Sequence, residues 1–92
     1  MLSLSIVLPT YNERENVQKF IPLLKKKFEN VPHEIIVVDD SSPDGTGEEV
    51  LKFAVEMPNI RLLSRKEKTG IGNALRHGYN EARNDIILSC DS

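Results

Sequence analysis

Carboxylates follow three of the apolar runs in this sequence, at positions where strands would end. They are Glu13, the neighbours Asp39 and Asp40, and Asp91. Carboxylates bind the hydroxyls of a nucleoside through charge-assisted hydrogen bonds, and they are the preferred ligands of Mg²⁺ or Mn²⁺ beside a diphosphate. The residue types therefore suggest a site for a nucleotide and a divalent cation.

A simpler interpretation exists for each carboxylate. Asp39 and Asp40 could merely end a strand, and since adjacent strand residues point to opposite faces, only one of them can face a crevice well. We favour binding, because the pair lies where a parallel sheet would hold a ligand. For Asp91, the residue type does not decide between a metal ligand and a surface position. Glu13 fits ligand contact and a favourable place near a helix N-terminus equally.

Arg65, Lys66 and Lys68 form a cationic loop. Their charges could meet a diphosphate, although a run of charges is more often a solvated surface. The pair of glycines that begins at Gly70 is not a dinucleotide fingerprint, because Leu75 holds the place of the third glycine. The loop is therefore only a secondary candidate for binding.

Other polar features suggest no chemistry. Residues 44–47 lack the lysine of a phosphate-binding loop, so we interpret them as a turn and a helix start. His33 and His77 have no evident partner in the sequence. Cys90 is the single cysteine, which excludes an intrachain disulfide and favours an inert packed thiol.

The composition describes one soluble globular domain. The chain has 92 residues, 39% hydrophobic and 28% charged, and 12 Lys and Arg against 14 Asp and Glu give a net charge of −2. This balance argues against nucleic acid as a partner. No apolar run approaches the roughly 20 residues that cross a bilayer, and no signal segment is evident, so we expect a cytoplasmic location.

Apolar periodicity predicts four strands that alternate with three helices. The strands are expected over residues 3–8, 34–38, 60–64 and 85–90, and the helices over residues 13–28, 46–57 and 71–82. Pro9 should stop the first strand, because proline cannot donate a ladder hydrogen bond. Pro22 should bend the first helix for the same reason.

Local patterns predict how two helices begin and how the third packs. Asn12 with Glu15, and Thr46 with Glu49, have the spacing of capping boxes. Gly78 lies in the middle of the third helix, where glycine costs about 1 kcal/mol relative to alanine. We therefore expect a backbone or ligand to approach Gly78 closely.

Alternating strands and helices of these lengths predict a doubly wound α/β sheet, mostly parallel, with helices on both faces. We expect the strand order 3-2-1-4. Ligands of such sheets bind beyond the carboxyl ends of the strands, where the order reverses. In this chain that point lies between the first and fourth strands, beside the polar clusters.

Three motifs carry a resemblance to a known family. They read IVLPTYNEREN at residues 6–16, EIIVVDDSSPDGT at residues 34–46 and KTGIGNA at residues 68–74, with Gly78 following. Together they closely resemble the inverting glycosyltransferases of family two, in particular dolichol-phosphate and polyprenol-phosphate mannosyltransferases. The likeness covers essentially the whole chain. It implies a three-layer, Rossmann-like GT-A fold, with residues 1–92 as its N-terminal nucleotide-sugar-binding part.

The resemblance also implies roles for individual residues. Pro9, Tyr11 and Glu13 would line the base and ribose pocket of the donor, usually GDP-mannose. Val38 and Asp40 would continue that pocket, with Asp40 near the nucleoside.

The implied metal ligand is Asp91, the first carboxylate of an Asp-x-Asp element that reaches the diphosphate through Mg²⁺ or Mn²⁺. Asp39, Lys68 and Gly70 are secondary candidates for donor binding. The implied acceptor is a polyprenyl phosphate, which is already anionic and needs little from a general base. No catalytic residue is assigned in this chain.

Family members are considerably longer, so we expect a truncated domain that cannot transfer sugar alone. The acceptor-binding half would follow residue 92, and the full protein could lie at the cytoplasmic face of a membrane. Two other hypotheses stay open: a non-catalytic nucleotide-binding or assembly module, and a receiver-type phosphoacceptor domain. The second would need its acid pair after the first strand. An unfinished sheet also leaves an edge through which two copies could pair.

Overall fold

The computed structural model describes residues 3–40, 42–65, 71–84 and 86–89, and for residues 71–74 and 77 it describes the backbone only. Strands and helices alternate along the chain as predicted. They are β1 (Leu4–Thr10), α1 (Arg14–Lys27), β2 (His33–Asp39), α2 (Thr46–Glu56), β3 (Ile60–Ser64), α3 (Ile71–Glu81) and β4 (Ile86–Ser89).

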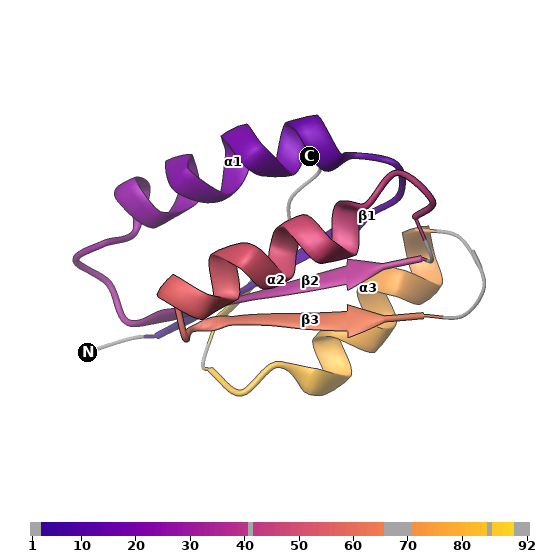
Figure 1. The fold of residues 1–92 in the computed structure, drawn as a ribbon. Coiled ribbons are helices and arrows are strands. Elements are labelled where there is room, and N and C mark those ends of the chain that lie inside the picture. The colour runs from indigo at the N-terminus through magenta and orange to yellow at the C-terminus, as the bar shows by residue number, and fades with distance from the viewer. Residues whose placement is uncertain (1–2, 41, 66–70, 85, 90–92) are drawn as a thin grey trace.

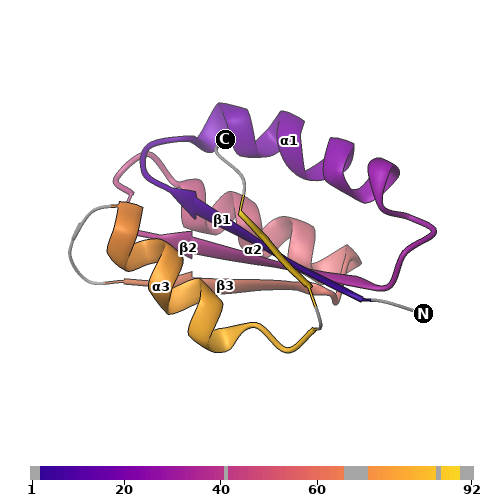
Figure 2. The same ribbon diagram turned by 180° about the vertical axis from the view of Figure 1, so that it is seen from behind.

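The four strands form one sheet in the order β3-β2-β1-β4, which confirms the predicted order. All three pairings are parallel. Helices α1 and α2 cover one face and α3 covers the other, so the chain has three layers (Figures 1 and 2). The loops that follow β1, β2 and β3 therefore all leave the same edge of the sheet.

Apolar side chains at alternate strand positions form a core on each face of the sheet. Strand β2 contributes to both cores, as its unbroken apolar run predicts. The core under α1 and α2 contains Ile6, Leu8, Val17, Ile21, Leu24, Ile35, Val37, Val50, Met57 and Ile60. The core under α3 contains Val7, Ile36 and Val38, with Leu63, Leu75 and Ala82 packed against it.

Gly78 is buried where α3 crosses the sheet, and its nearest neighbour there is Val7 of β1. The predicted close approach at Gly78 is thus confirmed, but the neighbouring atoms belong to the side chains of Val7 and Val38 and not to a backbone or a ligand.

Pro9 lies inside β1 and Pro22 lies inside α1. Strand β1 continues through Pro9, which pairs with Val38, so the prediction that Pro9 stops the strand is wrong. The amide of Leu4 bonds toward β2. Because backbone groups alternate between the two neighbouring strands, position 9 is directed toward β4. The last described pair of β1 with β4 is Val7 with Ser89, so position 9 lies beyond it. Proline there gives up no bond of the described ladder. Helix α1 continues through Pro22 without interruption, and the bend expected there stays a prediction.

A packed Cys90 implies that the strand before it is buried, but the described residues of β4, Ile86–Ser89, are all exposed. It is the last strand in the sheet, and α3 reaches it through a hydrogen bond of 3.0 Å between the hydroxyls of Tyr79 and Ser89. An apolar groove of about 770 Å³ lies between β4 and the C-terminal half of α1, lined in part by Leu23 and Leu88. Pairing of two copies through this edge stays a prediction.

A buried carboxylate links the strands at their amino ends, opposite the carboxyl edge of the sheet. Glu34 of β2 accepts hydrogen bonds from the Ser5 hydroxyl at 2.6 Å and from the Arg83 amide at 2.8 Å. Its second oxygen lies 3.2 Å from a guanidinium nitrogen of Arg61. This cluster joins β1, β2 and β3 to the connection between α3 and β4, far from the loops of the carboxyl edge.

Candidate functional site

The predicted donor-binding residues of the first two motifs lie together at the carboxyl edge of the sheet. Pro9 and Val38 are paired neighbours on β1 and β2, and Thr10 pairs with Asp39. Tyr11 and Glu13 follow in the loop from β1 to α1, and Asp40 follows β2 directly. Because β1 lies between β2 and β4, these residues border the point where the strand order reverses.

Alternation along the strands divides the two aspartates between the faces of the sheet. Val38 belongs to the core under α3, so Asp40 is directed to the face of α3 and Asp39 to the face of α1 and α2. Both carboxylates are buried, with exposed fractions of 4% for Asp39 and 5% for Asp40. The two aspartates therefore contact different parts of the chain.

Asp39 holds the two loops together. Its Oδ1 accepts hydrogen bonds from the Thr10 hydroxyl at 2.9 Å and from the Ser42 hydroxyl at 2.5 Å. Its Oδ2 accepts the Ser42 amide at 3.1 Å. The geometry gives this carboxylate a structural role, while its part in donor binding stays a prediction.

Asp40 is paired with a cation on the other face. Its Oδ1 lies 3.1 Å from Nε of Arg65, and both side chains are largely buried. The amide of Arg65 donates to the carbonyl of Asp39 at 2.8 Å, which fixes the start of the loop after β3. Arg65 thus holds the Asp40 carboxylate at the carboxyl edge, and the contact of Asp40 with a nucleoside stays a prediction.

The N-terminus of α1 is held by side chains from the next loop. Three consecutive amides donate to three alternate residues: Asn12 to Ser42 Oγ at 2.9 Å, Glu13 to Thr46 Oγ1 at 3.1 Å and Arg14 to Asp44 Oδ2 at 3.1 Å. Both predicted capping boxes are therefore wrong.

In neither helix does the N-cap residue make a side-chain hydrogen bond to the first turn. Helix α1 begins after Glu13 with no side-chain cap, and Asn12 has a left-handed backbone with a φ of 55°. Glu15 is therefore not a capping partner. Helix α2 begins after Gly45, which has a φ of 88°, and the Thr46 amide donates to Asp44 Oδ1 at 3.0 Å. One carboxylate, that of Asp44, thus serves both helices.

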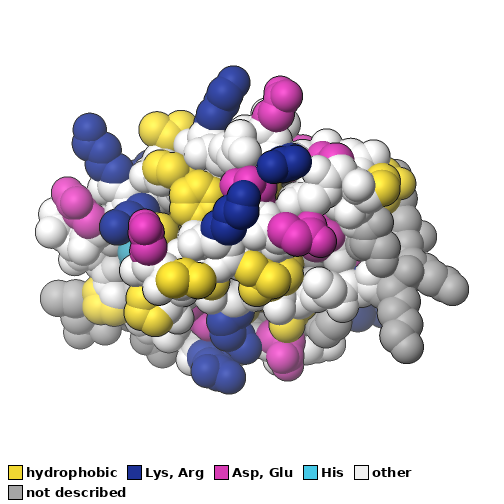
Figure 3. Space-filling view, viewed as in Figure 1, with side chains coloured by type: hydrophobic (Ala, Val, Ile, Leu, Met, Phe, Trp, Pro, Cys, Tyr) yellow, Lys and Arg dark blue, Asp and Glu magenta, His cyan; other side chains and the backbone are white. Residues whose placement is uncertain are grey.

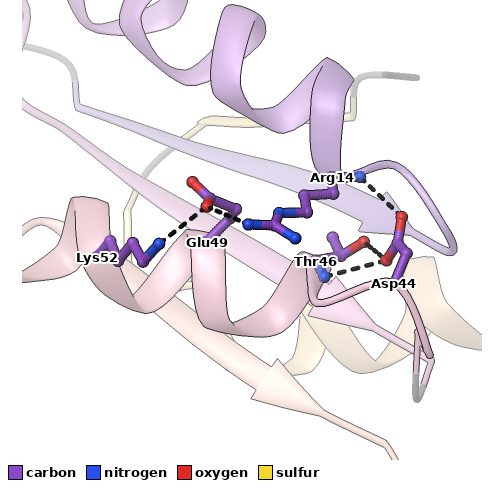
Figure 4. Close-up of polar contacts among 5 residues, drawn as sticks. All are labelled: Arg14, Asp44, Thr46, Glu49 and Lys52. Atoms are coloured by element: carbon purple, nitrogen blue, oxygen red, sulfur yellow. Dashed lines mark hydrogen bonds and ion pairs between the residues drawn. The ribbon is translucent and has the colours of Figure 1, made fainter.

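Figure 4 shows Asp44 between the two helices, beside a set of charged side chains. The hydroxyl of Thr46 also donates to Asp44, and this bond, with the amides of Arg14 and Thr46, lowers the pKa of Asp44 despite some loss of solvation. Further along, Oε1 of Glu49 lies 3.4 Å from Arg14 and 3.2 Å from Lys52. The bond from Lys52 is the main cause of a lowered pKa at Glu49.

A polar hollow of about 370 Å³ opens at this junction. It is lined by Asn12, Glu13, Arg14, Glu15, Asn16 and Asp44. Tyr11, which precedes Asn12 in the sequence, is 39% exposed. The loop that carries Tyr11 and Glu13 is therefore accessible to solvent while its backbone is anchored.

Several predicted residues lie outside the described residues: Lys68, Gly70, Cys90 and Asp91. The side chain of His77 is also outside them. Across residues 3–40, 42–65, 71–84 and 86–89, no group of three His, Cys, Asp or Glu side chains could hold a metal ion. The metal site at Asp91 stays a prediction.

Sequence reasoning missed four residues of this edge. Ser42, Asp44 and Thr46 were interpreted only as turn and helix start, and Arg65 only as part of a cationic loop. The spacing of the first three gives a signal in retrospect, because Ser42, Asp44 and Thr46 alternate and can present side chains to one side. Their partners lie about thirty residues away, and no local pattern predicts that contact.

The visible surface of α1 and α2 carries cationic and anionic side chains interspersed, with small separate apolar patches (Figure 3). This face offers no continuous basic stretch for a phosphate backbone. Within the described part of the chain, no helix is both long and apolar enough to cross a membrane.

Comparison with known proteins gives consistent matches. The model of glycosyl transferase family 2 matches residues 5–92. The dolichol-phosphate mannosyltransferase of Pyrococcus furiosus is 32% identical over 91 residues, which cover 99% of this chain and 26% of that protein. A dolichyl-phosphate beta-glucosyltransferase of Trichomonas vaginalis is 34% identical, covering 97% of this chain and 30% of that protein.

A solved structure has the same arrangement. The mannosyltransferase PcManGT from Pyrobaculum calidifontis, in complex with GDP-Man and Mn²⁺, matches with a TM-score of 0.83 and 28% identity, over 96% of this chain and 26% of that one. The chain thus spans about a quarter to a third of the length of the proteins that it matches.

Proposed function

The chain belongs to glycosyltransferase family 2, and from this we propose that it forms the donor-binding part of an inverting, metal-dependent transferase. The donor we propose is GDP-mannose, and the acceptor is a dolichyl or other polyprenyl phosphate. The Pyrococcus relative and the Pyrobaculum structure support mannose, since their names give mannosyl transfer and GDP-Man. The Trichomonas relative makes glucose the alternative sugar.

One observation carries the proposal. Pro9, Val38 and Asp40 share one face of the carboxyl edge, next to the strand where the order of the sheet reverses. Tyr11 extends from the adjoining loop with a large exposed surface. We propose that Tyr11 stacks on the base and that Asp40 accepts from hydroxyls or from base N–H groups, because aromatic rings and carboxylates suit these parts of a nucleoside.

The described residues position the donor and supply no nucleophile of their own. A nucleoside at Asp40 would share that carboxylate with Arg65, whose ion pair at 3.1 Å holds it at the carboxyl edge. We propose that the leaving diphosphate lies toward β4, where the chain continues to Asp91. An acceptor phosphate is already anionic, so the reaction depends on position more than on a general base.

A divalent cation would supply charge stabilisation to the leaving diphosphate. The described residues do not make up a site for it, and Asp91 is a single carboxylate outside them. Support for Mg²⁺ or Mn²⁺ therefore comes from Asp91 in the sequence and from the Mn²⁺ in the Pyrobaculum complex. We propose the remaining ligands and the acceptor pocket in the part of the enzyme that this chain does not span.

The acceptor also bears on location. We propose that the complete enzyme works at the cytoplasmic face of a membrane, because polyprenyl phosphates are held there by their apolar chains. The residues described here would then form its water-facing, donor-binding part.

The test is calorimetric titration of the chain with GDP-mannose, UDP-glucose and ATP, each with and without Mn²⁺. GDP-mannose is expected to bind most tightly and ATP least, and transfer to a polyprenyl phosphate is not expected from this chain alone. Absence of binding by both nucleotide sugars to the folded chain would overturn the proposal. Binding that never leads to transfer, even when the rest of a related enzyme is supplied, would instead indicate a nucleotide-binding module.

A further inference from the structure

We propose that Ser42, Asp44 and Thr46 are positioning residues for the donor loop, defined as residues 10–14, which include Tyr11, Glu13 and the first residue of α1. The inference deepens the proposed function and rests on it for the identity of the ligand. It concerns how the backbone of this loop is held, which the family resemblance does not describe.

Three hydrogen bonds join the two loops. The amides of residues 12, 13 and 14 donate to the side chains of residues 42, 46 and 44, respectively, at 2.9–3.1 Å. Each acceptor is a side-chain oxygen, so each bond depends on residue type and not only on the path of the backbone. The shape of the donor loop is therefore encoded about thirty residues later in the sequence.

The conformation of Asn12 shows why such support is needed. Its φ of 55° lies in the left-handed region, which asparagine adopts more easily than most residues but less easily than glycine. The bond from its own amide to Ser42 Oγ stabilises this turn. The turn in turn sets the direction in which the neighbouring Tyr11 leaves the sheet.

The support connects back to the end of β2. Ser42 donates through its hydroxyl and its amide to Asp39, which also accepts from Thr10. A closed chain of contacts thus runs from Thr10 through Asp39 and Ser42 to Asn12. Asp39 accepts from Thr10 at the start of the loop and Ser42 accepts from the amide of Asn12, so the loop cannot shift without breaking bonds at both.

Thr46 offers the sharpest test, because it is fully buried and has an apolar isostere. Its hydroxyl accepts from the Glu13 amide and donates to Asp44. Thr46→Val keeps the shape and loses both bonds, whereas Thr46→Ser keeps the hydroxyl. Asp44→Ala removes the support of Arg14 and of α2 together, so it serves as the second variant.

Two readouts are needed. The first is the affinity for GDP in the presence of Mn²⁺, measured by calorimetry. We expect Thr46→Val and Asp44→Ala to weaken it about tenfold, and Thr46→Ser to bind like the unaltered chain, since one hydrogen bond is worth about a factor of ten. The second readout is NMR of the free protein: the amides of Asn12, Glu13 and Arg14 should shift and exchange faster with solvent in both weakened variants.

Two control variants separate positioning from general stability. Glu34→Gln disturbs the opposite edge of the sheet, and Glu49→Gln removes the ion pair between α1 and α2 without touching the donor-loop amides. Neither should change GDP affinity, even where the folded state is less stable. Equal weakening by Glu34→Gln and Thr46→Val would overturn the positioning role.

The two proposals fail differently. If the unaltered chain binds no nucleotide, the proposed function fails, while the NMR readout still decides whether residues 42, 44 and 46 hold the donor loop. If the unaltered chain binds GDP and Thr46→Val binds it equally well, the positioning role fails and the proposed function stands. Unchanged amide signals in Thr46→Val would also overturn the positioning role.

Discussion

The backbone of Gly78 lies so close to Val7 that a Cβ at position 78 would overlap Cγ1 of Val7. The same atom would lie 3.3 Å from Cγ2 of Val38. Real Cβ atoms do not approach another atom as closely as this one would approach Val7, so α3 can lie at its observed depth only with glycine at this position. Gly78 thereby sets how α3 packs beneath the carboxyl edge of β1 and β2.

Gly78→Ala is therefore expected to destabilise the protein although alanine favours helices. Overpacking costs about 1–3 kcal/mol, and the helix propensity of alanine returns about 1 kcal/mol. A net decrease of up to about 2 kcal/mol in the free energy of unfolding should appear in urea denaturation. The double variant with Val7→Ala supplies the control. Because Val7→Ala removes the methyl groups that the new Cβ would meet, the double variant should lose less stability than the sum of the two single variants. Strict additivity would contradict the contact.

Glu34 should make stability depend on acid pH. Burial opposes its ionisation, but bonds from Ser5 and the Arg83 amide, with the charge of Arg61, lower its pKa below the usual 4.5. A carboxyl whose folded pKa is lower stabilises the fold above its unfolded pKa, and this stabilisation is lost as pH falls through the folded pKa.

We expect Glu34→Gln to lower the free energy of unfolding by about 1–3 kcal/mol near neutral pH, because a buried carboxylate loses charged partners. The difference from the unaltered chain should shrink as the pH falls below 4.5. Urea denaturation over that range measures it. A difference that stays constant across the range would show that the Glu34 charge does not contribute.

Asp39→Asn should act on the fold. The amide group offers one acceptor oxygen where the carboxylate offers two, so at least one of the donors Thr10 and Ser42 loses its partner. A loss of about 1–3 kcal/mol in the free energy of unfolding is expected. Glu48→Gln makes the same change of charge at an exposed site on α2 and should leave stability nearly unchanged.

Asp40→Asn should act on binding. Loss of a charged hydrogen bond to the nucleoside is expected to weaken GDP affinity by about 1–3 kcal/mol. Calorimetric titration measures this, and thermal unfolding checks that the variant is folded, because the ion pair with Arg65 is weakened at the same time. Unchanged affinity would remove Asp40 from the proposed site.

Much of this architecture could be predicted from the sequence because it depends on short-range patterns. The apolar run of β2 predicts burial on both faces, and glycine in the middle of a helix predicts close packing; both are confirmed. The strand order follows from parallel strands joined by helices, and it places the polar clusters at one edge.

The errors arise where distant contacts outweigh local patterns. Asn12 with Glu15 has the right spacing for a cap, yet Asp44 and Ser42 reach those amides from the next loop. Pro9 usually ends a strand, yet its missing N–H falls where the described part of β4 forms no pair. The exposure of β4 likewise depends on what packs over it, which its own apolar residues cannot indicate.

The pairing of Thr10 with Asp39 also determines where this sequence can tolerate a change in length. The connection from α1 to β2, residues 28–32, turns at the other edge of the sheet, so an extra residue there leaves the carboxyl edge intact. An extra residue inside β2 would turn every later side chain of that strand to the opposite face. Asp39 would then point toward α3 and Asp40 toward α2, exchanging the structural acid for the binding acid. Insertions are therefore compatible with this fold at one edge and incompatible with its site at the other.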